Sequence, residues 1–154
     1  MPETTLVHGT CVAIGGQGVL ILGQPGAGKS DLALRLIDQP GRGLNGVMRA
    51  SLLVADDQVA VTRDGGELFA SAPPAIAGLF EVRGLGIVPV EAVAQARLVL
   101  VVKITDAPAI DRMPDAANSR FEILGIGLPL TLVDAAKASA PARVRAALDR
   151  LGPG

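Results

Sequence analysis

A glycine-rich segment near the N-terminus constrains this chain more than any other feature. The segment fits the pattern G-x-x-x-x-G-K-S at every fixed position and consists of Gly23, Gln24, Pro25, Gly26, Ala27, Gly28, Lys29 and Ser30. It follows an apolar run over residues 18–22, and the pattern after it, over 31–38, is typical of a helix. A strand, a glycine loop and a helix in this order form a phosphate-binding loop. The alternative is an ordinary glycine-rich turn with a surface lysine.

The residue types of this loop explain how it would hold a chain of phosphates. Glycines allow consecutive backbone N–H groups to turn toward one anion, and the N-terminus of the helix adds partial positive charge. We expect Lys29 to reach the β- and γ-phosphates and the Ser30 hydroxyl to bind Mg²⁺. The sequence therefore predicts that the chain binds a nucleoside triphosphate together with Mg²⁺.

The composition limits both the core and the partners. The 154 residues suffice for one domain, and 49% of them are apolar, but Trp and Tyr are missing and only three Phe occur, so the core must be aliphatic. Nucleic acid is not an expected partner, because the net charge is −1 and no basic stretch occurs. The longest apolar run, 96–104, is too short to span a bilayer, and the N-terminus lacks the pattern of a signal peptide. With a single cysteine, Cys11, we expect a cytoplasmic protein that uses no membrane.

The order of predicted elements indicates one α/β domain with many strands and few helices. Single strands are expected over 5–14, 19–22, 51–55, 98–104 and 128–133. A hairpin is expected over 59–62 and 67–70, because the turn residues Arg63-Asp64-Gly65-Gly66 separate two alternating runs.

Two helices are expected, over 29–38 and 142–151. Apolar spacing places Leu32, Leu36 and Ile37 on one face of the first helix. In the second helix we expect the three apolar residues Val144, Leu148 and Leu151 to face inward. We expect three arginines to face outward, namely Arg143, Arg145 and Arg150.

An acidic pair follows the predicted strand 51–55. Phosphoryl transfer needs carboxylates that hold Mg²⁺ and a group that positions or deprotonates the attacking oxygen. Adjacent residues of a strand face opposite sides, so Asp56 and Asp57 are expected to divide these tasks. One would bind the metal through Ser30 and water, and the other would face the acceptor hydroxyl. The alternative is a solvated turn before the hairpin.

The only histidine, His8, lies in the first predicted strand. Histidine is the side chain whose charge changes closest to neutral pH. If His8 hydrogen-bonds one of the aspartates, it would orient that carboxylate and respond to its protonation. The alternative is a structural histidine within a strand.

Four segments, in this order, resemble one known family. They are His8-Gly9, the phosphate loop, Leu53-Val54-Ala55-Asp56-Asp57 and Phe80-Glu81-Val82-Arg83-Gly84-Leu85-Gly86-Ile87-Val88. Together they resemble the catalytic domain of HPr kinase/phosphorylase, and the segment from Glu81 to Ile87 is the most specific part. Longer members carry an N-terminal domain before this one, whereas we expect residues 1–154 to form the single catalytic domain.

The resemblance implies a fold and an activity. The implied fold is a phosphate-loop α/β domain related to the nucleotide-binding part of phosphoenolpyruvate carboxykinase, with strand-rich mixed sheets and few helices. The implied activity is ATP-dependent phosphorylation of a regulatory serine on HPr, a small phosphocarrier protein of the sugar phosphotransferase system. Many members also remove that phosphate with inorganic phosphate and release pyrophosphate. Family members are typically hexamers, so we expect a homo-oligomer.

The resemblance also implies roles for individual residues. Asp57, assisted by His8, would be the base toward the serine hydroxyl, and Asp56 would support it, although the two aspartates could exchange roles. Glu81 would hold Mg²⁺, and Arg83 would neutralise charge on the phosphoryl group in transfer. The alternative for Glu81 and Arg83 is a surface ion pair.

The C-terminal part of the chain bears on the direction of reaction and on the acceptor. The closest match to the family's late basic loop is Ala140-Pro141-Ala142-Arg143, so Arg143 is a candidate for contact with phosphate or with the partner. Because little else of that loop is found, we expect kinase activity to dominate and phosphorolysis to be weak or missing. Two other functions stay open: a phosphate-loop kinase for a different acceptor, either a small molecule or a protein, and a nucleotide-sensing module without turnover.

Overall fold

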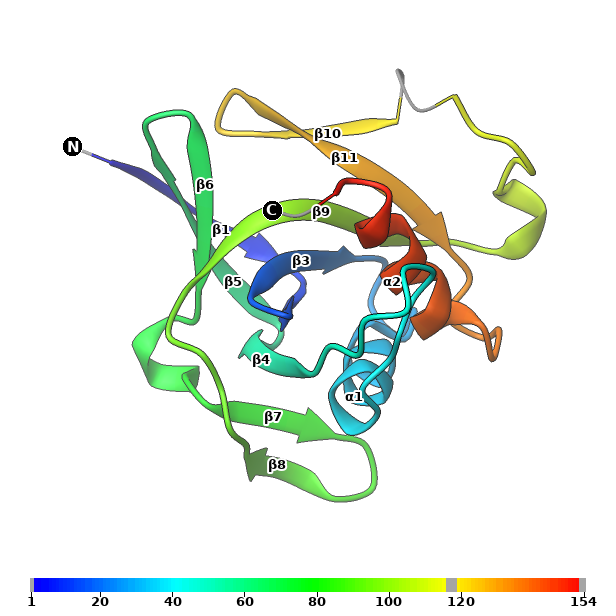
Figure 1. Ribbon diagram of the computed structural model, residues 1–154. Coiled ribbons are helices and arrows are strands. Elements are labelled where there is room, and N and C mark those ends of the chain that lie inside the picture. Colours follow the sequence, from blue (N-terminus) through cyan, green and yellow to red (C-terminus); the bar gives the residue numbers. More distant parts are fainter. Residues whose placement is uncertain (1, 116–118, 153–154) are drawn as a thin grey trace.

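The fold is a curved mixed sheet with helices packed on one of its faces (Figure 1). The computed structural model describes residues 2–115 and 119–152. Within these ranges there are two α-helices, α1 (Lys29–Asp38) and α2 (Ala140–Asp149), and two short 3₁₀ helices, Pro74–Ile76 and Ala107–Ala109. No helix in these ranges is long and apolar enough to cross a membrane.

Nine strands form the main sheet. They are β1 (Glu3–His8), β2 (Thr10–Ile14), β3 (Gln17–Leu22), β4 (Ser51–Ala55), β5 (Gln58–Asp64), β6 (Glu67–Ser71), β9 (Ala96–Ile104), β10 (Arg120–Ile123) and β11 (Ile126–Val133). The order is β1-β5-β6-β9-β3-β2-β4, and β11 joins β10 to β9. The pairs β3–β9 and β9–β11 are parallel and the other pairs are antiparallel, so the sheet is mixed. A separate hairpin pairs β7 (Leu79–Val82) with β8 (Gly86–Pro89).

Most predicted elements are present, but the first predicted strand is divided. The hairpin around Arg63-Asp64-Gly65-Gly66 is confirmed as β5–β6. The expectation of one strand over 5–14 is wrong, because the chain leaves β1 and enters β2 at Gly9. A Cβ at Gly9 would lie 2.8 Å from the Ile21 carbonyl oxygen, and the Gly9 N–H donates to the Asp57 carbonyl at 3.0 Å. Glycine is therefore needed at this junction between two strands. Before it, β1 pairs with β5, and after it, β2 pairs with β3 and β4.

The alternation of side chains along the central strands creates two apolar cores. On β2, Val12 and Ile14 belong to the core that contains Leu32 and Leu36 of α1. Cys11, from the same strand, belongs to the core on the other face of the sheet. Burial raises the pKa of the Cys11 thiol to about 12, so this thiol stays protonated at neutral pH.

Helix α2 corrects two of the predicted orientations. Val144 and Leu148 are fully buried, as expected. Leu151 lies beyond the last turn of the helix and is 39% exposed, so the prediction that it faces inward is wrong. The prediction that Arg145 faces outward is also wrong, because only 3% of this residue is exposed.

The buried guanidinium of Arg145 satisfies backbone carbonyls at the end of α1. It donates to the carbonyls of Leu36 (3.1 Å), Gln39 (2.9 Å) and Arg49 (2.8 Å), and to Ser51 Oγ (3.2 Å). The last carbonyls of a helix have no partner within the helix, so these donors replace water there. Burial, and then the nearby charge of Arg49, lower the pKa of Arg145, but arginine keeps its charge in proteins.

The same contacts fix the segment between α1 and β4. The backbones of Gly41 and Arg49 exchange two hydrogen bonds and close residues 41–49 into a loop. The Arg49 guanidinium pairs with the Asp149 carboxylate of α2, which also accepts a hydrogen bond from the Leu44 N–H at 2.6 Å. This segment is thus tied to α2 directly and to the end of α1 through Arg145.

We predict that Arg145→Met lowers the free energy of unfolding by about 2–4 kcal/mol, because buried carbonyls lose a charged donor while the aliphatic stem is kept. Urea denaturation measures this change. The control is Arg150→Ala on the exposed end of the same helix, which should change stability by less than about 0.5 kcal/mol. Equal midpoints for the wild type and Arg145→Met would contradict this account of the clamp.

Candidate active site

A cleft of about 790 Å³ lies beside the phosphate loop. Its walls come from six parts of the chain: the end of β1, the start of β2, the loop with the first two turns of α1, the turn after β4, the β7–β8 hairpin, and the segment after β11. Most of the predicted site residues line this cleft: His8, Pro25, Gly26, Ala27, Gly28, Lys29, Ser30, Asp57, Glu81 and Arg83.

The predicted phosphate loop lies between a strand and a helix, as its sequence indicates. It connects β3 to α1, and Gly28 immediately before the helix has a φ of 104°, a left-handed conformation that favours glycine. The buried Lys29 ammonium donates to the carbonyls of Gly23 (2.9 Å) and Gln24 (3.1 Å). These two residues therefore take part through their backbone, whereas residues 25–30 form the surface of the cleft.

The Asp56 carboxylate joins three elements beneath the cleft. This residue is only 6% exposed. Its Oδ1 accepts hydrogen bonds from Ser30 Oγ of α1 at 2.8 Å and from Thr10 Oγ1 of β2 at 3.1 Å, and its Oδ2 accepts from the Glu81 N–H of β7 at 3.1 Å. Thr10 is a residue that sequence reasoning missed, since its only signal was its position two residues after His8.

The neighbouring Asp57 carboxylate points to the mouth of the cleft. Asp57 has a φ of 71°, which is uncommon for a residue other than glycine, and the Gln58 N–H donates to the Asp56 carbonyl at 2.8 Å across the turn. The side chain of Asp57 is 70% exposed, and its Oδ1 lies 3.1 Å from His8 Nε2. The two aspartates therefore face different surroundings, as expected, but a strained turn rather than the pleat of a strand separates them.

The structure places the remaining predicted residues differently. Glu81 and Arg83 are exposed and both line the cleft, from β7 and the turn after it. Arg143 is not among the residues that line it: this exposed side chain donates from Nε to Ser139 Oγ of its own helix at 2.8 Å. The structure thus brings the acidic residues to the phosphate loop but leaves Arg143 elsewhere.

The oxygen atoms near the loop fit Mg²⁺ bound together with phosphates. In the described part of the chain, no group of three or more His, Cys, Asp or Glu side chains is arranged to hold a metal ion. Mg²⁺ is usually bound by one or two carboxylates together with water and the phosphates of a substrate. The Ser30 hydroxyl beside the Asp56 carboxylate, with Glu81 also lining the cleft, is such a donor set.

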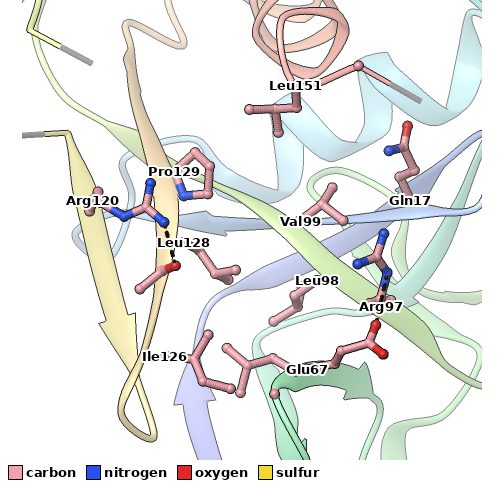
Figure 2. A pocket seen from close by; sticks show the side chains of 14 residues that line it. Gln17, Glu67, Arg97, Leu98, Val99, Arg120, Ile126, Leu128, Pro129 and Leu151 are labelled. Atoms are coloured by element: carbon pink, nitrogen blue, oxygen red, sulfur yellow. Dashed lines mark hydrogen bonds and ion pairs between the residues drawn. The ribbon is translucent and has the colours of Figure 1, made fainter. Parts of the chain in front are cut away.

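A second cleft, of about 490 Å³, lies where β9 and β11 diverge (Figure 2). Its charged side chains already have partners: Arg97 Nε lies 3.4 Å from Glu67 Oε2, and Arg120 Nη2 donates to the Gly127 carbonyl at 3.0 Å. None of the predicted site residues lines it. The groups suited to phosphoryl transfer are therefore gathered in the first cleft.

The comparison with protein families agrees with this geometry. Residues 1–144 match the model of a family described as "HPr Serine kinase C-terminal domain". The chain belongs to this family. The resemblance stated from the four sequence segments is thereby confirmed.

Proteins similar to this chain include both sequences and a solved structure. The chain is 47% identical over 87 residues to HPr kinase/phosphorylase 1 of Oceanobacillus iheyensis, and this alignment covers 56% of this chain and 25% of that protein. It is 42% identical over 102 residues to the HPr kinase/phosphorylase of Clostridium tetani, covering 66% and 30% respectively. The chain thus spans less than a third of the length of these curated relatives. The solved Hpr(Ser) kinase/phosphatase of Coxiella burnetii aligns over 96% of this chain and 89% of its own, with a TM-score of 0.74 and 27% identity.

The wall of the cleft that follows β11 is held by Asp134. Its carboxylate accepts hydrogen bonds from the N–H groups of Ala136 (2.9 Å) and Ala107 (3.0 Å). Both hydrogen bonds lower the pKa of Asp134 below its ordinary value, and the bond from Ala136 has the larger effect. Ala135 and Ala136 line the cleft, so Asp134 orders a wall that the sequence analysis did not identify.

We predict that Asp134→Asn destabilises the fold at neutral pH and that the difference from wild type disappears in acid. A carboxylate whose pKa is lowered by folding stabilises the fold fully above its unfolded pKa of about 3.9, and this contribution is lost as the pH falls through the lower folded value. Urea unfolding at a series of pH values measures it, with the exposed Asp111→Asn as control. A difference that stays constant below about pH 4 would contradict the assignment.

Proposed function

We propose that this chain is an ATP-dependent serine kinase that phosphorylates HPr or an HPr-like phosphocarrier protein. The observation that carries the proposal is the exposed Asp57–His8 pair at the mouth of a cleft whose floor holds the phosphate loop. Membership of the HPr Serine kinase C-terminal domain family and the names of the relatives support the choice of acceptor. A nucleotide sensor without turnover would not need an accessible carboxylate–histidine pair beside the phosphates.

We infer that the nucleotide site is of the phosphate-loop type related to that of phosphoenolpyruvate carboxykinase. The amides of the loop and the Lys29 ammonium would hold the phosphates of ATP, because N–H donors and a helix N-terminus favour anions. Ser30, Asp56 and Glu81 would hold Mg²⁺, which when bound neutralises charge on the phosphates.

In the proposed transfer, Asp57 accepts the proton of the attacking serine hydroxyl. Its exposure leaves one carboxylate oxygen free for the acceptor, while His8 holds the other at 3.1 Å. Arg83, on the hairpin across the cleft, would balance the charge that develops on the transferring phosphoryl group. Asp56 is already occupied by three hydrogen bonds, so it supports the site and does not face the acceptor.

The reverse reaction would use the same groups. A protonated Asp57 would return its proton to the serine oxygen while inorganic phosphate attacks phosphoserine. We propose that this phosphorolysis is weak, because Lys29 and Arg83 are the only Lys or Arg side chains among the residues that line the cleft. Arg143, the remaining candidate, lies on the exposed face of α2.

We also infer that residues 1–154 act as one catalytic domain that associates with itself. Large exposed apolar side chains support association, and they occur at Leu44, Val47 and Met48 and at Leu85 and Ile87 of the hairpin. A hexamer, as in the resembled family, is the assembly we propose. We also propose that the enzyme is cytoplasmic, because its proposed substrate ATP is found there.

The test is incubation with γ-labelled ATP, Mg²⁺ and HPr, with the modified residue mapped by mass spectrometry. We expect one phosphoserine on HPr. We expect Asp57→Asn to lower kcat by about 100-fold or more while ATP affinity stays within several-fold, since the base acts in the transition state. Lys29→Ala should instead abolish both tight ATP binding and transfer.

The matched control is Asp64→Asn, an exposed aspartate at the end of β5 outside the cleft, which should keep wild-type kinetics. Full activity of Asp57→Asn would refute the assignment of the base, and loss of activity in Asp56→Asn alone would exchange the two roles. Binding of ATP without any transfer to HPr would contradict the proposed acceptor.

A further inference from the structure

Arg35 makes a connection behind the wall of the cleft that its sequence position does not suggest. It lies on α1, the helix that begins with Lys29 and Ser30. Its Nη2 donates to the Ala135 carbonyl at 2.6 Å and its Nη1 to the Lys137 carbonyl at 3.3 Å. Ala135 is 100 positions away in the sequence. One guanidinium therefore ties the phosphate-loop helix to the segment that follows β11.

That segment, residues 135–137, forms a wall of the cleft. Ala135 and Ala136 both line it. The wall touches the phosphate loop, because a Cβ at Gly28 would lie 3.3 Å from the Ala135 Cβ. Asp134 fixes the segment to Ala107, and Arg35 fixes it to α1, so two polar anchors hold its position.

The reacting groups lie away from this wall. Asp57 follows β4 and His8 lies just before β2, whereas residues 135–137 follow β11; in the sheet, β3, which leads into the loop, lies between β2 and β9, and β9 pairs with β11. In the proposed transfer the γ-phosphate therefore points to the side of Asp57 and His8. The rest of the nucleotide then leaves the loop on the side of residues 135–137. The side chains available there, Ala135, Ala136 and Leu34, are small or apolar and offer a packing surface to a sugar or a base.

We propose that Arg35 is a positioning residue for the nucleoside part of the triphosphate, acting through the wall 135–137. This inference rests on the proposed binding of ATP in this cleft. Without the guanidinium, the carbonyls of Ala135 and Lys137 lose their donors and the wall is free to move from the loop. The nucleoside then loses its packing surface, while the loop amides and Lys29 still hold the phosphates.

The test compares two ligands that differ only in the nucleoside. Calorimetry with Mg²⁺ measures binding of ATP and of inorganic tripolyphosphate, which carries the same phosphate chain. We expect Arg35→Ala to weaken ATP binding about 10-fold and tripolyphosphate binding less than about twofold. The reason is that a displaced wall loses its contacts with the nucleoside, whereas the loop keeps its contacts with the phosphates. At saturating ATP, kcat should stay within about twofold while KM for ATP rises.

Arg35 also pairs with Asp31 at 3.0 Å, and this contact must be separated from the wall. Freeing the Asp31 carboxylate would repel both ligands, and tripolyphosphate at least as strongly as ATP because it carries more negative charge, so a selective loss of ATP affinity reports on the wall. Arg35→Lys, which keeps a charged donor group on a single nitrogen, should give a smaller loss for ATP. The control is Arg63→Ala, which removes a hydrogen bond to the Leu124 carbonyl (2.8 Å) outside the cleft and should change neither affinity.

Equal weakening of both ligands in Arg35→Ala would overturn the inference, because Arg35 would then act on the loop or on the whole fold. Unchanged ATP binding would overturn it as well. A wild-type protein that binds ATP but transfers no phosphate to any protein would refute the proposed function, and the ratio measured with Arg35→Ala would still decide the inference.

Discussion

The buried carboxylate of Asp56 is the interaction on which the site depends. A buried charge is costly unless hydrogen bonds compensate it, and here the three donors come from β2, α1 and β7. Each bond therefore fixes one element relative to the end of β4. The Ser30 bond sets the start of the phosphate-loop helix, and the Glu81 bond sets the hairpin that carries Arg83. Because the backbone turns immediately after Asp56, the next carboxylate is presented to solvent beside His8.

Helix α1 is held along its whole length by polar contacts to distant parts of the chain. Ser30 bonds Asp56 at its start, Arg35 bonds the wall 135–137 in its second turn, and Arg145 satisfies the Leu36 carbonyl near its end. Apolar packing of Leu32 and Leu36 fills the space between these contacts. A helix fixed in this way presents the loop amides without reorganisation when a phosphate binds, which is the condition for electrostatic stabilisation of a transition state.

The local parts of this arrangement could be predicted from the sequence, because they depend on short-range patterns. The loop between β3 and α1 and the β5–β6 hairpin follow from turn residues and alternating apolar runs. The different surroundings of Asp56 and Asp57 were predicted from strand alternation, but a turn at Asp57 produces them. The break at Gly9 could not be predicted, because it is required by a carbonyl of β3 that the sequence does not place there. Arg145 was misplaced for a similar reason: spacing on a helix separates polar from apolar faces but does not show that unpaired carbonyls lie opposite. The contacts of Thr10 and Arg35 join residues that are 46 and 100 positions apart in the sequence, so no local pattern indicates them. Their part in ligand binding is a prediction.

The most direct test of the account is the effect of Mg²⁺ on ATP affinity in the wild type and in Asp56→Asn, measured by calorimetry with and without EDTA. The account predicts that the substitution reduces the enhancement by Mg²⁺ about 10-fold or more, because the carboxylate beside Ser30 is lost, while metal-free ATP still binds the loop. Thr10→Val, which removes one donor to Asp56 and keeps the carboxylate, should retain most of the enhancement. An undiminished effect of Mg²⁺ in Asp56→Asn would contradict the account.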